Sequence, residues 1–397
     1  MIKITPPKHI ISVLDTLVSK DFDAYIVGGS LRDAIMNRHA NDWDVATSAL
    51  PGDVAELFER TVKTGEKYGT VTVLLPECKV EVTTFRTDGL YLDNRHPETV
   101  EFISDIKEDL SRRDFTINAM AASISGEIID PFDGAKDIKD GVIRCVGEPQ
   151  KRFEEDALRM LRAFRFAAQL GFRIDKTTLS AIKESAKKAA NVSAERIYVE
   201  IDKTLMSQKP EVAGEIIKAG LLDRFICGSY KNAIELSRLS KVPDEHELRW
   251  GVLCAVLLEE KCIESAATFL RELRLESKII STIHTALTIR EFPTDRNGQK
   301  RLLAKHGASA VRLAAVLNDV HTGQSLPSLI AIYNLLASGE CMSLEKLALT
   351  GKDLMEIGIT EGPELGEKLQ KLLDYVIINP SDNKRDILLN IVKNNTL

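Results

Sequence analysis

The sequence has no long apolar run and few cysteines, and both absences exclude classes of protein. No stretch approaches the roughly 18 apolar residues that a membrane-spanning helix needs. The N-terminus is an amphipathic run without a long apolar centre and a cleavage site, so we expect no signal peptide. The six cysteines stand singly, without a Cys-x-x-Cys pair, so the sequence supports neither a zinc ribbon nor a redox motif. Free thiols suit a reducing cytoplasm, where we expect the protein to reside.

Familiar nucleotide-binding signatures are missing too. The chain has neither the Gly-x-x-x-x-Gly-Lys-Ser/Thr of a P-loop nor the Gly-x-Gly-x-x-Gly of a dinucleotide site. Any nucleotide binding is therefore of a different kind. The sequence also shows no fixed repeat period and no low-complexity segment.

Length and charge set further bounds. A chain of 397 residues, 44% of them hydrophobic, is typical of a soluble globular protein with two to four domains. The formal net charge of −6 argues against a protein that coats nucleic acid. This net charge still allows a local basic strip on an otherwise acidic protein.

The pattern of apolar residues changes near residue 145. Before that point, short apolar runs alternate with helical stretches such as 52–60 and 114–123. The runs at 69–75 and 79–85 meet at Pro76, which predicts a β-hairpin. After residue 148 the pattern is helical throughout, including one helix over 153–172. Strands followed by helices predict an α+β head with a mixed sheet, joined to an all-α remainder.

Two aspartates, Asp42 and Asp44, precede an apolar run. In a strand, residues i and i+2 point to one face, so both carboxylates would project together. Burying two like charges is costly, and a divalent cation such as Mg²⁺, which prefers oxygen ligands, removes that cost. A solvated turn is the ordinary alternative for an isolated Asp-x-Asp.

Glu81 stands in the middle of a β-branched run, where an acidic residue is disfavoured unless it has a partner. If its strand lies beside that of Asp44, Glu81 supplies a third carboxylate. Three acids around one or two metal ions suit phosphoryl transfer. An outward-facing residue on an edge strand is the alternative.

The segment "IVGGSLRD" predicts a strand, a turn at Gly28 and Gly29, and a helix that starts near Ser30. Glycine lets backbone N–H groups approach a ligand closely, and a helix N-terminus favours anions. Arg32 adds a charge that could bind a phosphate. By itself the pattern is more often an ordinary turn.

A second basic cluster, Arg112, Arg113 and Asp114, precedes the apolar stretch at 115–123. Asp114 could be the N-cap of a helix and the arginines ordinary surface charge. A clamp on a triphosphate and ribose is an equally good interpretation.

The helix expected over 153–172 carries charges three residues apart, which places them on one slowly winding stripe. The stripe contains Asp156, Arg159, Arg162 and Arg165. An exposed face of salt bridges is the common alternative. Three arginines without a lysine favour a site that binds planar groups or phosphates.

Taken in order, "GGSLRD", "DWD", "EVTTFRTDG", "RRDFTINA" and "EDALRMLRAFRF" strongly resemble the motifs of the class II tRNA nucleotidyltransferase / poly(A) polymerase family. The resemblance covers about the first half of the chain, and "TGKDLMEIGITEGPELGEKL" extends it more weakly. It implies a polymerase-β-like palm in residues 1–147, a helical neck that recognises the base in 148–206, a body in 207–300 and a tRNA-binding tail in 301–397.

The resemblance also implies an activity: untemplated addition of CCA to the 3′ end of tRNA from CTP and ATP, with Mg²⁺. It assigns metal binding and catalysis to Asp42 and Asp44, with Glu81 as the third acid. The implied nucleotide contacts are Gly29, Arg32, Arg113, Asp156, Arg159, Arg162 and Arg165.

Base selection by one acid and one arginine is physically reasonable. Cytosine and adenine both present an amino donor beside a ring-nitrogen acceptor on the pairing edge. Asp156 could accept from the amino group and Arg159 donate to the ring nitrogen. Guanine and uracil place a carbonyl where the carboxylate needs a donor, and such mismatches are heavily penalised in dry sites.

Other activities stay open within this family. Relatives that add only CC lack a loop segment, whereas residues 86–102 are present at full length here. The loop reads Arg95-His96-Pro97 in place of the usual Arg-Arg-Pro. An A-adding tRNA nucleotidyltransferase or a poly(A) polymerase is the alternative enzyme, and a non-catalytic RNA-binding protein is the alternative from another class.

The rest of the sequence says less. The seven histidines include no His-Asp pair, which argues against a fused phosphohydrolase domain. Lys300, Arg301, Lys305 and Arg312 could contact the acceptor arm of tRNA or simply face solvent. Whether the chain forms a homodimer stays open.

Overall fold

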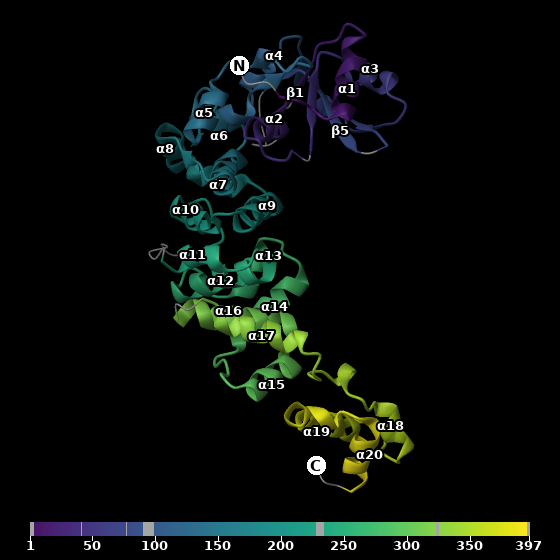
Figure 1. Cartoon of the computed structure of the whole chain (residues 1–397). Helices are drawn as coiled ribbons and strands as arrows, with labels where there is room; N and C mark the ends of the chain where they lie inside the picture. Colours follow the sequence, from purple (N-terminus) through teal and green to yellow (C-terminus); the bar gives the residue numbers. More distant parts are fainter. Residues whose placement is uncertain are drawn as a thin grey trace. The chain divides into compact units, whose positions relative to one another are not determined.

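The computed structural model describes residues 4–40, 42–76, 78–89, 99–227, 234–322 and 325–394. The chain divides into two compact units, Met1–Arg224 and Phe225–Leu397. The first contains the sheet and runs from purple to teal in Figure 1, and the second is helical and runs from green to yellow. The predicted α+β head followed by helices is therefore confirmed. The finer division at residues 147, 206 and 300 stays a prediction.

A seven-stranded mixed sheet forms the centre of the first unit, in the order β3-β4-β5-β2-β1-β8-β9. Among these neighbours β2 and β5 pair in parallel, and the other pairs are antiparallel. The strands are β1 (Ala24–Val27), β2 (Asp44–Thr47), β3 (Thr61–Gly65), β4 (Thr70–Leu74), β5 (Lys79–Thr84), β8 (Ala121–Ala122) and β9 (Ile128–Ile129).

Strands β4 and β5 form the predicted hairpin, with Leu74 opposite Lys79. Their valines, for example Val73 and Val82, are buried in the core with the apolar side of α1 (Lys8–Val18). Because side chains alternate along a strand, Glu81 points to the other face of the sheet. The valine pattern thus fixes which face carries the polar residues.

Three short helices complete the head. Helix α2 (Gly28–Ile35) follows β1 directly, and α3 (Pro51–Leu57) follows β2. Helix α4 (Ile106–Ser111) buries Ile106 and Leu110 in a second, smaller core with residues of β1, β2 and β8. The strands β6 (Arg86–Asp88) and β7 (Val100–Phe102) pair separately.

The prediction of a helix over residues 114–123 is wrong. The structure has a single 3₁₀ turn, Thr116–Asn118, and then strand β8. Ala121 and Ala122 pair with Val27 and Ile26 of β1. Pairing within the sheet therefore overrides the helical preference of this alanine-rich segment.

The helix expected over 153–172 is also interrupted. Helix α6 (Pro149–Glu155) ends before Asp156, whose backbone is extended, and α7 begins at Leu158 and runs to Leu170. Strand β11 (Arg173–Ile174) pairs with β10 (Val142–Ile143), so one strand does follow residue 148. The other helices of this unit are α5 (Gly134–Asp140), α8 (Lys176–Ser185), α9 (Ala194–Leu205) and α10 (Ala213–Lys218).

The second unit contains helices α11 to α20. Helix α12 is buried around Trp250 and packs on α14 and α16. A separate core joins α18, α19 and α20. The bounds are α11 (Ile234–Ser237), α12 (His246–Glu259), α13 (Ala266–Glu272), α14 (Ser277–Thr288), α15 (Arg296–His306), α16 (Ala308–Thr322), α17 (Pro327–Ala337), α18 (Gly351–Glu356), α19 (Pro363–Ile378) and α20 (Arg385–Lys393). Among the described residues, no helix combines the length and hydropathy that crossing a membrane requires.

Candidate active site

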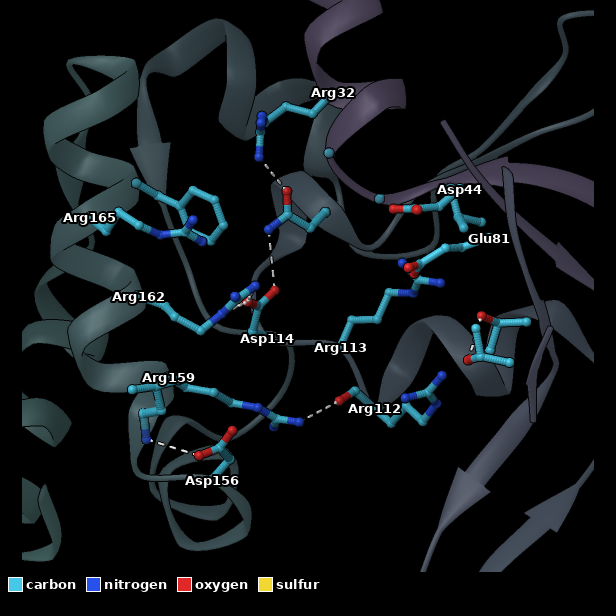
Figure 2. Close-up of a pocket in the computed structure, with 18 of the residues that line it drawn as sticks. Arg32, Asp44, Glu81, Arg112, Arg113, Asp114, Asp156, Arg159, Arg162 and Arg165 are labelled. Atoms are coloured by element: carbon cyan, nitrogen blue, oxygen red, sulfur yellow. Dashed lines mark hydrogen bonds and ion pairs between the residues drawn. The ribbon is translucent and has the colours of Figure 1, made fainter. Parts of the chain in front are cut away.

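A cavity of about 600 Å³ lies in the first unit, between the sheet and α7. Figure 2 shows the arginines of α7 on one side of it and Asp44 and Glu81 on the other. Nine of the ten residues predicted for the site line this cavity: Gly29, Arg32, Asp44, Glu81, Arg113, Asp156, Arg159, Arg162 and Arg165. Asp42 does not line it.

The two acids of the sheet are direct neighbours. Asp44 begins β2 and lies opposite Glu81 in the parallel pairing with β5, so the predicted adjacency of these strands is confirmed. Glu81 is exposed rather than buried, because β5 turns its valines to the core and this residue to the open face. It lies on a central strand, which excludes the edge-strand alternative.

Asp42 is placed differently from the expectation. Strand β2 begins at Asp44, so Asp42 lies before the strand and its side chain is exposed. The alternation rule therefore does not bring the two aspartates together. Asp42 is nevertheless near enough to affect its neighbour electrostatically.

The pKa of Asp44 is raised from its ordinary value to about 6. Burial of the carboxylate is the largest cause, followed by the negative charge of Glu81. Arg113 acts in the opposite direction, and Asp42 adds a smaller increase. The positive charges of the protein thus neutralise the carboxylates of Asp44 and Glu81 only in part.

Helix α2 starts earlier than expected, at Gly28 rather than near Ser30. Gly28 has a φ of +76°, and a Cβ atom there would lie 3.1 Å from Oδ2 of Asp44. A side chain at this position would therefore be strained and crowd the acid. Both Gly28 and Gly29 line the cavity, so the first turn of α2 lies at its wall.

Helix α7 contributes three arginines, Arg159, Arg162 and Arg165, to the cavity. Asp156 does not belong to their helical stripe, because it lies in the break between α6 and α7. Its Oδ1 atom accepts a hydrogen bond from the N–H of Leu158, 3.0 Å away, which satisfies a backbone donor at the start of α7. Asp156 reaches the same cavity from this break.

Among the described residues, eight arginines line the cavity, and each already forms an ion pair with a carboxylate of the chain. The pairs are Arg32–Asp33, Arg86–Asp88, Arg112–Asp109, Arg113–Asp109, Arg159–Glu155, Arg162–Asp114, Arg165–Glu200 and Arg196–Asp156. The cavity is thus rich in arginine, and each guanidinium is held in a defined position by its carboxylate partner.

Asp114 is not the helix N-cap that the sequence suggested, because no α-helix follows it. Its Oδ2 atom lies 2.6 Å from Nη2 of Arg162, and its Oδ1 atom accepts a hydrogen bond from the N–H of Phe115. Burial alone would raise the pKa of Asp114, but Arg162 and Arg159 lower it to about 2. Asp114 is thus a fixed anion in the wall of the cavity.

The cavity is also lined by residues that were not predicted for the site, among them Asn118, Phe166 and Arg196. The guanidinium carbons of Arg32, Arg162 and Arg165 lie 5.3, 5.2 and 4.2 Å from the ring centre of Phe166. Phe166 itself is almost fully buried, so its ring lies in the wall of the cavity beside these three arginines. The sequence predicted helices throughout this region but gave no signal that connects Arg196 with the site.

Metal binding was assigned to Asp42 and Asp44. Among the described residues, His, Cys, Asp and Glu form no group of three that is placed to hold a metal ion. The acids of the sheet that line the cavity are Asp44 and Glu81, with Asp42 nearby, whereas Asp114 and Asp156 pair with arginines. An oxygen-only set of this kind suits a hard cation that takes its other ligands from water and phosphate. The Arg95-His96-Pro97 sequence lies outside the described residues.

Comparison with known protein families divides the chain into three matches. Residues 24–144 match the Poly A polymerase head domain, and residues 171–226 match an RNA and SrmB-binding site of polymerase A. Residues 242–392 match domain 2 of tRNA nucleotidyltransferases. The first match contains the sheet with both of its acids.

Whole-length relatives and a solved structure agree with these matches. The CCA-adding enzyme of Pediococcus pentosaceus is 36% identical over 392 residues, which cover 96% of each chain. The CCA-adding enzyme of Geobacillus sp. (strain WCH70) is 36% identical over 96% of this chain and 95% of its own. The crystal structure of Bacillus stearothermophilus CCA-adding enzyme in complex with CTP superimposes with a TM-score of 0.83 at 32% identity. It covers 99% of this chain and 98% of that chain.

Proposed function

Because the chain belongs to the CCA-adding enzymes of the tRNA nucleotidyltransferase / poly(A) polymerase family, we propose that it adds and repairs the 3′-terminal CCA of tRNA. Its substrates are CTP, ATP and a tRNA that lacks part or all of this end. The observation that carries the proposal is the single cavity with two sheet carboxylates on one side and the arginines of α7 on the other.

The reaction is a nucleotidyl transfer. The 3′-hydroxyl oxygen of tRNA forms a bond to the α-phosphorus of the nucleotide, and the bond from that phosphorus to the bridging oxygen breaks. Pyrophosphate leaves, and the hydroxyl proton passes to solvent. We place this reaction beside Asp44 and Glu81, the paired acids of the neighbouring strands β2 and β5.

Nucleotidyltransferases of this family depend on a metal ion, and we assign Mg²⁺ to Asp42 and Asp44, with Glu81 as the third acid. The raised pKa of Asp44 supports this assignment, since it reflects burial of the carboxylate first and then the negative charge of Glu81 beside it. When bound, Mg²⁺ supplies positive charge that lowers the pKa of the attacking hydroxyl and neutralises the phosphates. The protein's part is to hold two or three carboxylate ligands at the start of β2 and on the adjacent strand β5.

We assign the phosphates to Gly29, Arg32 and Arg113. The first turn of α2 supports this assignment, because backbone N–H groups at a helix N-terminus favour anions. The guanidinium of Arg113 adds charge close to Asp44. Together these groups surround the region where a triphosphate and the sheet acids meet.

We assign the base to Asp156 and Arg159, with Arg162 and Arg165 as further nucleotide contacts. All four line one cavity. The Asp156 carboxylate accepts from the amino group of cytosine or adenine, and Arg159 donates to the adjacent ring nitrogen. The carboxylate is held by Leu158 and Arg196, which supports a role that requires one fixed orientation.

Extension of a tRNA that lacks CCA tests the proposal. With Mg²⁺, CTP alone should add two residues, and CTP with ATP should add three. Asp44→Ala should abolish both additions, whereas Asp140→Ala, an exposed surface change outside the cavity, should leave them intact. Failure of the unmodified protein to extend the tRNA would refute the assignment.

The CTP-only arm separates the alternatives. An A-adding tRNA nucleotidyltransferase or poly(A) polymerase adds nothing from CTP alone but extends with ATP. A non-catalytic RNA-binding protein extends with neither. A cytoplasmic location stays a prediction, and the six free cysteines support it.

A further inference from the structure

The side chain of Asn118 lies between the helix that begins at the glycine pair and the arginines of α7. It is held by the 3₁₀ turn Thr116–Asn118, in which its N–H donates to the carbonyl of Phe115. The side chain is 7% exposed and lines the cavity. A polar amide buried at this place needs partners for both of its ends.

Both ends of the amide are used, and by residues of different elements. Its Oδ1 atom accepts a hydrogen bond from Nη1 of Arg32 at 2.8 Å. Its Nδ2 atom donates to Oδ1 of Asp114 at 3.2 Å. The other oxygen of Asp114 accepts from Nε of Arg162 at 2.8 Å. Figure 2 shows Arg32, Asp114 and Arg162 in this sequence.

Arg32 is held on two sides. Its Nε and Nη2 atoms donate to Oδ1 of Asp33, at 2.9 and 2.8 Å, and its Nη1 atom donates to Asn118. A guanidinium has five N–H donors. Within the described residues these three bonds leave two donors of Arg32, one on each terminal nitrogen, for a ligand. Two such donors match the geometry of a phosphate.

We propose that Asn118 is a positioning residue that fixes the Arg32 guanidinium for the phosphates of the incoming nucleotide. This rests on the proposed function. Only a side chain that both accepts and donates can join a guanidinium to a carboxylate in this way. The amide also connects the phosphate side of the cavity to the Asp114–Arg162 pair on the base side.

Steady-state extension with CTP and with ATP tests the proposal in Asn118→Leu, Arg32→Met and the double variant. Asn118→Leu should raise KM about tenfold for both nucleotides alike, because the phosphates are common to them. In the Arg32→Met background the same change should have no further effect on kcat/KM. Asn191→Leu, at an exposed position of the same unit, is the matched control.

Three results would overturn the proposal: unchanged kinetics in Asn118→Leu, an effect on only one nucleotide, or effects of the two variants that multiply. Asn118→Ala serves as a second variant, and the thermal midpoint of each variant shows whether it is folded. Extension by the unmodified protein distinguishes a failure of the proposed function from a failure of the positioning role. If it does not extend tRNA, the proposed function fails, whereas normal extension with unaltered Asn118 variants removes only the positioning role.

Discussion

Arg196 of α9 lies 2.8 Å from Oδ2 of Asp156, the acid between α6 and α7. The other oxygen of Asp156 accepts the N–H of Leu158. The carboxylate is therefore oriented from two sides, by a backbone group at the start of α7 and by a guanidinium 40 residues later. A nucleotide base that pairs with the Asp156 carboxylate therefore encounters it in a single orientation.

We expect Arg196→Met to weaken discrimination between bases. Without its guanidinium partner the Asp156 carboxylate can rotate and tolerate a carbonyl where it now requires a donor. The ratio of kcat/KM for CTP to that for UTP should fall by about tenfold. Single-nucleotide extension assays measure this ratio. Arg173→Met, an exposed arginine outside the cavity, should leave it unchanged.

We expect Asp44→Asn to abolish extension and yet stabilise the metal-free protein. The raised pKa means that the folded chain holds this proton more tightly than the unfolded chain does. Burial of the ionised carboxylate therefore costs stability above about pH 6. Removing the charge should raise the free energy of unfolding at pH 8 by about 1–3 kcal/mol.

Calorimetry in EDTA checks this expectation. The stabilising effect should shrink as the pH falls below about 6 and vanish below the ordinary pKa, because both proteins are then uncharged at this position. Added Mg²⁺ should raise the thermal midpoint of the unmodified protein and not that of Asp44→Asn. An equal effect of Asp44→Asn at pH 4 and pH 8 would contradict the assigned pKa.

Asp114 should show the opposite dependence on pH. Its pKa is lowered to about 2, so its ionised form stabilises the folded chain above the ordinary pKa. We expect Asp114→Asn to reduce the free energy of unfolding by about 2 kcal/mol between pH 5 and 8. The deficit should diminish as the pH falls from 4 towards 2, because the carboxyl of the unmodified protein then becomes protonated. Urea unfolding across this range provides the measurement, and a deficit independent of pH would disprove the ion pair.

In the second unit we expect Lys300 to be structural rather than a tRNA contact. Its side chain is 4% exposed, pairs with Glu340 and donates to the carbonyl of Ile377. Lys300→Met should reduce stability by about 1–3 kcal/mol. Arg301→Met and Lys305→Met, at exposed positions of the same helix, should change stability by less than about 0.5 kcal/mol. Equal effects of all three would contradict this role for Lys300.

The sequence predicted the elements whose patterns are local. Alternating valines and a proline-containing turn predicted the β4–β5 hairpin, which is present. Residue spacing on a helix predicted that Arg159, Arg162 and Arg165 share a site, and they line one cavity. The neighbouring positions of Asp44 and Glu81 depended on one further assumption, that β2 and β5 are adjacent, and the sheet order confirms it.

The sequence could not predict features that tertiary contacts decide. Residues 153–172 contain no glycine or proline before Gly171, so nothing in them marks the break at Asp156. The Asp156 carboxylate at the break is held by the nearby N–H of Leu158 and by the distant guanidinium of Arg196. The strand at Ala121 likewise depends on its partner in β1. Helix propensity predicts local structure poorly where a neighbouring strand or a buried charge provides the hydrogen-bond partner of a segment.

The eight internal ion pairs of the cavity have a consequence for turnover. A triphosphate that enters meets arginines that carboxylates already hold, so it binds through the N–H donors that these pairs leave open, as at Arg32. The carboxylates offset part of the positive charge, so we expect a moderate net attraction for the nucleotide. Because the arginines are held by the chain itself, we expect them to keep their positions when pyrophosphate departs, which leaves the cavity ready for the next nucleotide.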